Sequence, residues 1–322
     1  MTSETTRRVV YLDQKGWIEL AKMYYGRTSK GRRLIERILE GSDKGKLVFP
    51  LSISHLDETM RISNARRKKQ LASLMAEMSK GYAFQPYVDL VIQAEVLNIV
   101  LRKLGLPAQN IRDRVLGRGI SHLIGGKPGL VSKRSAKSLE LPEEIKNKLL
   151  ERLESTETIE FALKLNRPRS LDLGMKESIE KMEKIRRELA RIRDNDLRKR
   201  VFLARNLTEL VLPKLAEILY KNHLPVDFVI KEKPTREDIY GFLDSVPTAL
   251  CFFTLIYQRD QQLQRPIEMN DFNDIWFLTL AIPYSDIVVT EKMFASIAKR
   301  AKLDRKCKTA ILTSTSELGA YV

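Results

Sequence analysis

Hydrophobic and polar positions along residues 7–85 predict strands and helices in alternation. The β-branched run Arg8–Leu12 predicts a short strand, and Lys15–Tyr25 has the apolar spacing of a helix. Lys46–Phe49 predicts a second strand, which Pro50 ends. This alternation is typical of an α/β fold.

Residues 86–262 follow a different pattern. Long stretches have helical spacing and few strand signals interrupt them. The most charged stretch, Met175–Tyr220, predicts two helices with a break at residues 194–196. We therefore expect an all-helical insertion over residues 86–262.

From residue 263 the α/β pattern returns. Phe272–Ile282 and Lys292–Ala301 have helical spacing, while Ile287–Val289 and Lys308–Leu312 predict strands. Alternating elements of this kind favour a parallel sheet. Residues 1–85 and 263–322 are therefore predicted to be the two halves of one α/β domain, which the insertion separates in sequence.

The charge of the chain bears on its partner. The 322 residues carry a formal net charge of +16, and a surface this basic attracts polyanions, of which nucleic acid is the most common. The alternative is that lysines and arginines on long helices only solvate the protein. The size of the insertion also suggests a dedicated substrate or a protein partner.

Cysteine content and the length of the apolar runs indicate the cellular location of the protein. Cys251 and Cys307 are the only cysteines and neither is in a CxxC pair, so we expect neither a structural zinc site nor a disulfide framework. The N-terminus lacks the apolar region of a signal peptide. The longest apolar run, Val246–Tyr257, is too short for a membrane helix of roughly 20 residues. The sequence predicts a cytoplasmic protein without membrane contact.

Acidic residues stand at the ends of the predicted strands. Asp13 follows the first strand directly, and Asp286 and Glu291 flank the strand at Ile287–Val289. Asp274 opens the apolar helix near the C-terminus. Carboxylate oxygens are the ligands of hard cations such as Mg²⁺ or Mn²⁺, and a parallel sheet gathers its binding loops at one edge.

The order of these acids resembles that of PIN-like domains, the fold of many Mg²⁺- or Mn²⁺-dependent ribonucleases. Asp13 matches the acid after strand one, Glu58 the acid in the helix after strand two, and Asp274 the acid that opens a long apolar helix. The resemblance covers about the first 80 and the last 55 residues and omits the insertion. It implies a metal-dependent nuclease that prefers RNA to DNA, and small members of the family often act as toxins or in host defence.

The fourth acid departs from the family pattern. PIN-like domains carry Thr-x-Asp after a strand, whereas this chain has Thr290 followed by Glu291 and Lys292. Glu291 could supply the acid one position early, and Asp286 is the other candidate. Asp271 precedes Asp274 by three positions, so it could be a further ligand or could cap the helix.

The predicted site therefore has two overlapping sets of residues. The catalytic set is Asp13, Glu58, Asp274 and Glu291, and the candidate metal ligands are Asp13, Glu58, Asp271, Asp274 and Asp286. Two divalent ions held by such acids can activate a water and stabilise the leaving oxygen of a phosphodiester. Each acid alone has an ordinary explanation as a turn, first-turn or capping residue. His55 lies one turn before Glu58 and could shuttle protons or simply pack.

Two groups of cations are predicted to hold the nucleic-acid backbone. One lies just after Glu58 and the other in the charged helices of the insertion; together they are Arg61, Arg66, Arg67, Lys184, Arg187, Arg191, Arg198 and Lys199. The leading hypothesis is a metal-dependent endonuclease. The alternatives are a non-catalytic nucleic-acid-binding or scaffolding protein with a degenerate PIN-like fold, and a helical interaction module whose acids are only helix caps.

Overall fold

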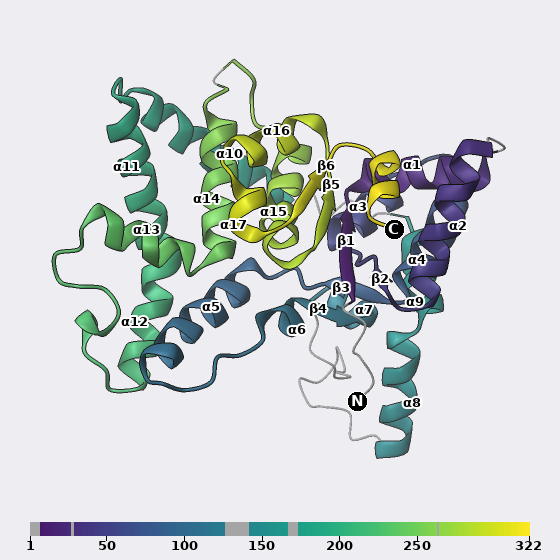
Figure 1. The fold of residues 1–322 in the computed structure, drawn as a ribbon, viewed down its shortest axis with the longest axis horizontal. Helices are drawn as coiled ribbons and strands as arrows, with labels where there is room; N and C mark the ends of the chain where they lie inside the picture. Colours follow the sequence, from purple (N-terminus) through teal and green to yellow (C-terminus); the bar gives the residue numbers. More distant parts are fainter. Residues whose placement is uncertain (1–6, 27–28, 126–141, 167–172, 263) are drawn as a thin grey trace.

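A parallel sheet of four strands joins the two ends of the chain (Figure 1). The computed structural model describes residues 7–26, 29–125, 142–166, 173–262 and 264–322. The strands are β1 (Arg8–Leu12), β2 (Leu47–Val48), β5 (Ile287–Val289) and β6 (Ala310–Leu312), in the order β2-β1-β5-β6. All three pairings are parallel, and Leu12 lies beside Val289. The prediction of a parallel sheet built from both chain ends is confirmed.

Both faces of the sheet are buried. Alternate residues of β1 point to opposite faces, and each set enters a different core. Val10 and Leu12 belong to one hydrophobic core, and Val9 and Tyr11 belong to another. Burial on both faces explains why the strands read as continuous apolar runs without polar alternation.

Helices of the N-terminal segment cover the first face. They are α1 (Gln14–Tyr25), α2 (Ser29–Asp43), α3 (Ile53–Met60) and α4 (Ala65–Ser79), joined by α9 (Thr156–Lys164) and η4 (Thr315–Ala320). Trp17 and Leu20 of α1 are fully buried, and Leu74 of α4 is as well. Their spacing is that of an amphipathic helix face.

Helices of the C-terminal segment and much of the insertion cover the second face. The closest are α5 (Val88–Lys103), α14 (Pro247–Asp260), α15 (Met269–Tyr284), α16 (Lys292–Arg300) and α17 (Leu303–Cys307). Beyond them lie α10 (Leu173–Ala190), α11 (Asn195–Asn206), η2 (Leu207–Val211), α12 (Leu212–Lys221), η3 (Val226–Phe228) and α13 (Arg236–Asp244). In Figure 1, α11, α12 and α13 form the end of the molecule farthest from α2.

The insertion is not wholly helical, which corrects the expectation. Residues Leu116–Arg118 form β4, which pairs antiparallel with β3 (Tyr82–Phe84). The short helices α6 (Ile111–Val115) and α7 (Gly119–Leu123) flank β4, and α8 (Glu143–Glu154) leads into α9. Leu-Gly-Arg has no β-branched pattern, so tertiary pairing decides its conformation. Arg118 also stacks on the Tyr82 ring at 4.6 Å.

The insertion does not pack as a unit of its own. Its helix α9 contacts α3 and α4 on the first face, whereas α14 packs along α15 on the second. In the described part of the chain no single helix is long and apolar enough to cross a membrane. Only the pair α13–α14, bent by 110°, has the necessary length and composition when both helices are taken together.

Candidate metal centre at the carboxyl edge of the sheet

Asp13 lies where β1 ends and α1 begins. One carboxylate oxygen, Oδ1, accepts a hydrogen bond of 2.6 Å from the Gly16 N–H and caps α1. The other oxygen, Oδ2, is buried and has no hydrogen-bond partner among the described residues. A buried oxygen of this kind is costly unless something binds it. Asp13 therefore has one oxygen in use for the fold and one available to a ligand.

Two further buried oxygens lie on the residues beside Asp13. Since Leu12 pairs with Val289, Thr290 follows β5 at the same edge of the sheet as Asp13. Thr290 Oγ1 and Gln14 Oε1 are also buried without partners within the described ranges, while Gln14 Nε2 donates to Thr59. Oxygen atoms are the ligands that a hard divalent cation prefers.

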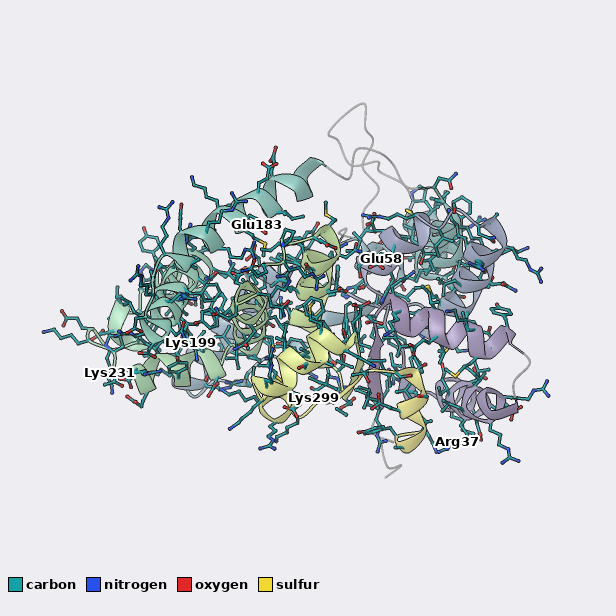
Figure 2. The ribbon with its side chains drawn as sticks, turned by 90° about the horizontal axis from the view of Figure 1, so that it is seen from above. Arg37, Glu58, Glu183, Lys199, Lys231 and Lys299 are labelled. Atoms are coloured by element: carbon teal, nitrogen blue, oxygen red, sulfur yellow. The ribbon has the colours of Figure 1, made fainter. Side chains whose placement is uncertain are left out.

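Glu58 reaches this edge from α3. The helix begins at a capping box in which Ser52 N–H donates to His55 Nδ1 at 2.9 Å. Burial and the charge of Asp13 together raise the pKa of Glu58 to about 7, while Arg61 at the end of the same helix opposes the rise. Figure 2 shows Glu58 near the middle of the molecule, at the junction of the N-terminal helices with the rest.

Asp274 completes the group from the second turn of α15. Burial raises its pKa to about 8, and the charges of Glu58, Asp13 and Glu291 act in the same direction. Burial also raises the pKa of Asp13 to about 6, with a further contribution from Glu291. Each carboxylate is therefore near enough to the others to disfavour their ionisation. Glu291 lies exposed at the start of α16 and faces this group.

These four acids come together from four different elements, and we call them the acid cluster: Asp13, Glu58, Asp274 and Glu291. The side chains are coupled but do not form a preassembled cage. No three His, Cys, Asp or Glu side chains within the described ranges stand close enough to one another to hold a metal ion as they are placed. A cation would offset their mutual repulsion, which is why such clusters bind divalent metals.

Asp271 has a different role from its neighbour Asp274. Its Oδ2 accepts from Arg259 Nη2 at 2.7 Å and its Oδ1 from Arg265 Nη2 at 3.0 Å. It also accepts from the Glu268 N–H and caps α15. The carboxylate and the Arg259 guanidinium are both buried. Of the two roles that the sequence leaves open, capping is the one the contacts favour, because two guanidinium groups already neutralise both oxygens.

Asp286 lies at the wrong edge of the sheet, which corrects its prediction as a metal ligand. Its Oδ2 accepts from the Val9 N–H at 2.6 Å and from Arg112 Nη2 at 2.5 Å. Asp286 precedes β5, whereas Glu291 of the acid cluster follows it. Three strand residues span about 10 Å, so the two acids lie at opposite edges of the sheet. An acid stands near each end of β5, so the sequence pattern alone does not show which of the two lies at the same edge of the sheet as Asp13.

His55 packs in the core and does not reach the acid cluster as a charged group. Its ring stacks on Tyr11 and meets the edge of Trp17. Burial lowers the pKa of His55 to about 3, so the ring is neutral at physiological pH. Of the two explanations for this histidine, packing and helix capping describe its contacts.

A basic groove begins beside Glu58. Residues from the end of α3, the start of α4 and the end of α9 line it: Met60, Arg61, Ile62, Ser63, Ala65, Lys68, Lys69, Lys164 and Asn166. Lys68 Nζ is held by Met60 O and Asn166 Oδ1 at 3.0 and 3.1 Å. Arg61 pairs with Asp57, and Arg66 and Arg67 lie exposed nearby on α4. Lys164 and Asn166 belong to the insertion, so sequence spacing could not place them here.

The cations predicted to bind nucleic acid on the charged helices of the insertion differ in their exposure and contacts. Lys184 and Arg187 are exposed on α10, and Arg191 is exposed in the turn that follows it. Arg198 is half-buried and donates to Ile192 O at 2.9 Å. Lys199 lies over the Tyr240 ring, and Figure 2 places it toward the opposite end of the molecule from Arg37, well away from Glu58. Arg198 and Lys199 thus have structural contacts of their own.

Arg265 is a residue of this region that the sequence pattern does not single out. It precedes α15, pairs with Asp271 and reaches Met293 Sδ at 3.0 Å, two residues after Glu291. Its side chain is 43% exposed. A partly exposed guanidinium therefore stands between the start of α15 and Met293 of α16.

No family model, curated protein or solved structure matches this chain.

Proposed function

We propose that this protein is a divalent-metal-dependent endonuclease with a PIN-like fold, which hydrolyses phosphodiester bonds and prefers RNA to DNA. The observation that supports it best is the acid cluster. Four acids, from the ends of β1 and β5 and from α3 and α15, lie within electrostatic range of one another, and three of them have raised pKa values. Such perturbed carboxylates are common at catalytic sites.

Mg²⁺ or Mn²⁺ would be held by Asp13, Glu58 and Asp274, with Glu291 as the fourth acid. A bound divalent ion supplies a water of lowered pKa and stabilises charge on the leaving oxygen. The remaining contributions come from the chain itself. Gly16 fixes one oxygen of Asp13, which orients the other. Arg265 is held by Asp271, three residues before Asp274 on the same helix, and its partly exposed guanidinium could bind a substrate phosphate.

The substrate backbone would lie along the basic groove. Arg61 both lowers the pKa of Glu58 and lines the groove, so one end of the groove lies on the helix that carries Glu58. Lys69 and Lys164 follow along it. Contacts to phosphate position a nucleic acid without reading its sequence. The preference for RNA, a role as a toxin or in defence, a protein partner on the insertion, and the cytoplasm as location remain predictions.

The direct test is cleavage of single-stranded RNA and DNA by the purified full chain, with Mg²⁺, with Mn²⁺ and with a chelator. We expect cleavage that needs the metal and that Asp274→Asn abolishes. Asp89→Asn is the matched control, because Asp89 is an exposed residue of α5 that pairs only with Lys214 of α12 among the ion pairs of the described residues. Metal-independent cleavage, or full activity of Asp274→Asn, would refute the assignment.

A second function has an observation of its own. The acids are not close enough to form a ready metal site, and the fourth acid is an exposed Glu. A nucleic-acid-binding protein with a degenerate PIN-like fold accounts for both. It would bind nucleic acid with strong salt dependence but would show neither Mn²⁺ binding nor cleavage. A purely helical interaction module would show none of the three.

A further inference from the structure

The two cysteines of the chain meet in the second core. Cys251 lies in α14, within the insertion, and Cys307 is the last residue of α17. They are 56 positions apart in sequence, yet their Sγ atoms are 3.8 Å apart. Both are free thiols. Because these are the only cysteines among 322 residues, their contact makes a dithiol without competing partners.

The two thiols are in unlike surroundings. Cys251 is fully buried, whereas Cys307 is partly exposed. The hydrogen bond from the Cys251 thiol lowers the pKa of Cys307, and the neighbouring Lys306 adds to this. Burial raises the pKa of Cys251. The thiolate therefore forms on Cys307, which is the sulfur that an oxidant can approach.

We propose that Cys251 and Cys307 are a redox-active pair that closes to a disulfide on exposure to a peroxide and so ties α14 to α17. A disulfide bond is about 2.05 Å long, so the sulfurs need to approach by about 1.8 Å. Cys307 ends a helix of only five residues, so a small shift of that turn is enough. This proposal does not depend on nuclease activity.

The chemistry balances with one peroxide per pair. The Cys307 thiolate attacks a peroxide oxygen, the O–O bond breaks, and the products are a sulfenic acid and hydroxide. The Cys251 thiol then attacks the Cys307 sulfur and the S–O bond breaks. The departing hydroxyl group takes up the thiol proton and leaves as water. The two sulfurs lose two electrons in all, and the peroxide becomes two waters.

The bond would enclose the segment that bears half of the acid cluster. Residues 251–307 include α15, β5 and α16, and with them Asp274 and Glu291. Closing a loop of this length restricts the unfolded chain, so the oxidised protein should unfold at a higher temperature, by roughly 5–10 °C.

The test uses the full chain, reduced and freed of reductant, then treated with a small molar excess of hydrogen peroxide. We expect both thiols to disappear together, a mass loss of two hydrogens, and a tryptic pair that joins residues 237–259 to Cys307-Lys308 under non-reducing conditions. Dithiothreitol should reverse all three changes and the rise in melting temperature.

Variants separate the pair from single-cysteine oxidation. Cys307→Ser and Cys251→Ala should each fold, keep one thiol and show no rise in melting temperature on oxidation. Should Cys251→Ala fail to fold, Cys307→Ser at the less buried position still decides. The proposal is overturned if the wild type gains oxygen on Cys307 while Cys251 stays a thiol, if it links only between chains, or if both thiols persist under these conditions.

Discussion

The Asp274→Asn substitution should stabilise the metal-free protein while it removes the response to metal. In the folded chain, burial and the charges of Glu58 and Asp13 raise the pKa of Asp274 from 3.8 to about 8. The folded state thus binds a proton that the unfolded state releases. The stability from this group is complete below pH 3.8 and is lost as the pH rises through about 8.

The size of the effect follows from the interval between the two pKa values. At pH 7, about three pH units above the unfolded value, keeping Asp274 in the fold costs about 4 kcal/mol, at about 1.4 kcal/mol per unit. At pH 5 the interval is about one unit and the cost is about 1.6 kcal/mol. Asn has nearly the shape of Asp and no charge, so the variant avoids this cost at both pH values.

The assay is thermal or urea unfolding in a chelator at pH 5, 7 and 8.5, for the wild type, Asp274→Asn and the control Asp89→Asn. We expect the advantage of Asp274→Asn to grow with pH and to reach roughly 6 °C in melting temperature at pH 7. Adding Mn²⁺ should stabilise the wild type most at pH 8.5, where protons compete least, and should leave Asp274→Asn unchanged. A variant that is less stable than the wild type at every pH, or a gap that shrinks as the pH rises, would refute the reasoning.

Three further outcomes follow from the same structure. Asp271→Asn should cost about 3–5 kcal/mol in urea unfolding, because it leaves the Arg259 charge buried without its carboxylate; a loss of activity with full stability would make Asp271 a ligand instead. Replacing Lys69 and Lys164 with Gln should reduce the log–log salt slope of RNA binding by roughly 0.7 per lost phosphate contact. The same change at Lys184 and Lys199 tests the α10–α11 helices, and an unchanged slope for both pairs of variants would place the substrate elsewhere. Cleavage should rise from pH 5.5 and level off above about pH 8, as Asp13, Glu58 and Asp274 lose protons; a rate that falls over this range would contradict a site that works ionised.

Sequence patterns predict the sheet well because its strands are short apolar runs with acids or turns at their ends. β1 and β5 lie within the segments expected to be strands, and their pairing across the chain follows from the α/β alternation. β4 was missed, since three residues with a central Gly carry no strand signal and depend on β3 for their hydrogen bonds. Local propensity cannot show a pairing that tertiary contact decides.

The same limit explains which site residues could be found in advance. Asp13 was predictable because its position after a strand fixes its edge of the sheet. Asp286 was misplaced because the residue before a parallel strand lies at the other edge, and the difference depends on strand direction. Lys164 lies about a hundred positions from Arg61, and the groove that they share exists only after α9 packs against α3 and α4.

Asp271 and Asp274 show why charge alone does not reveal a ligand. They stand three residues apart on one helix, so their side chains share a face and the sequence treats them alike. Their surroundings come from distant parts of the chain. Asp271 meets the guanidinium groups of Arg259 and Arg265, which neutralise it, while Asp274 meets the carboxylates of Glu58 and Asp13, which repel it. A neutralised carboxylate gains little from a cation, whereas a repelled one gains a great deal, so the proposed metal would bind at Asp274 rather than at Asp271.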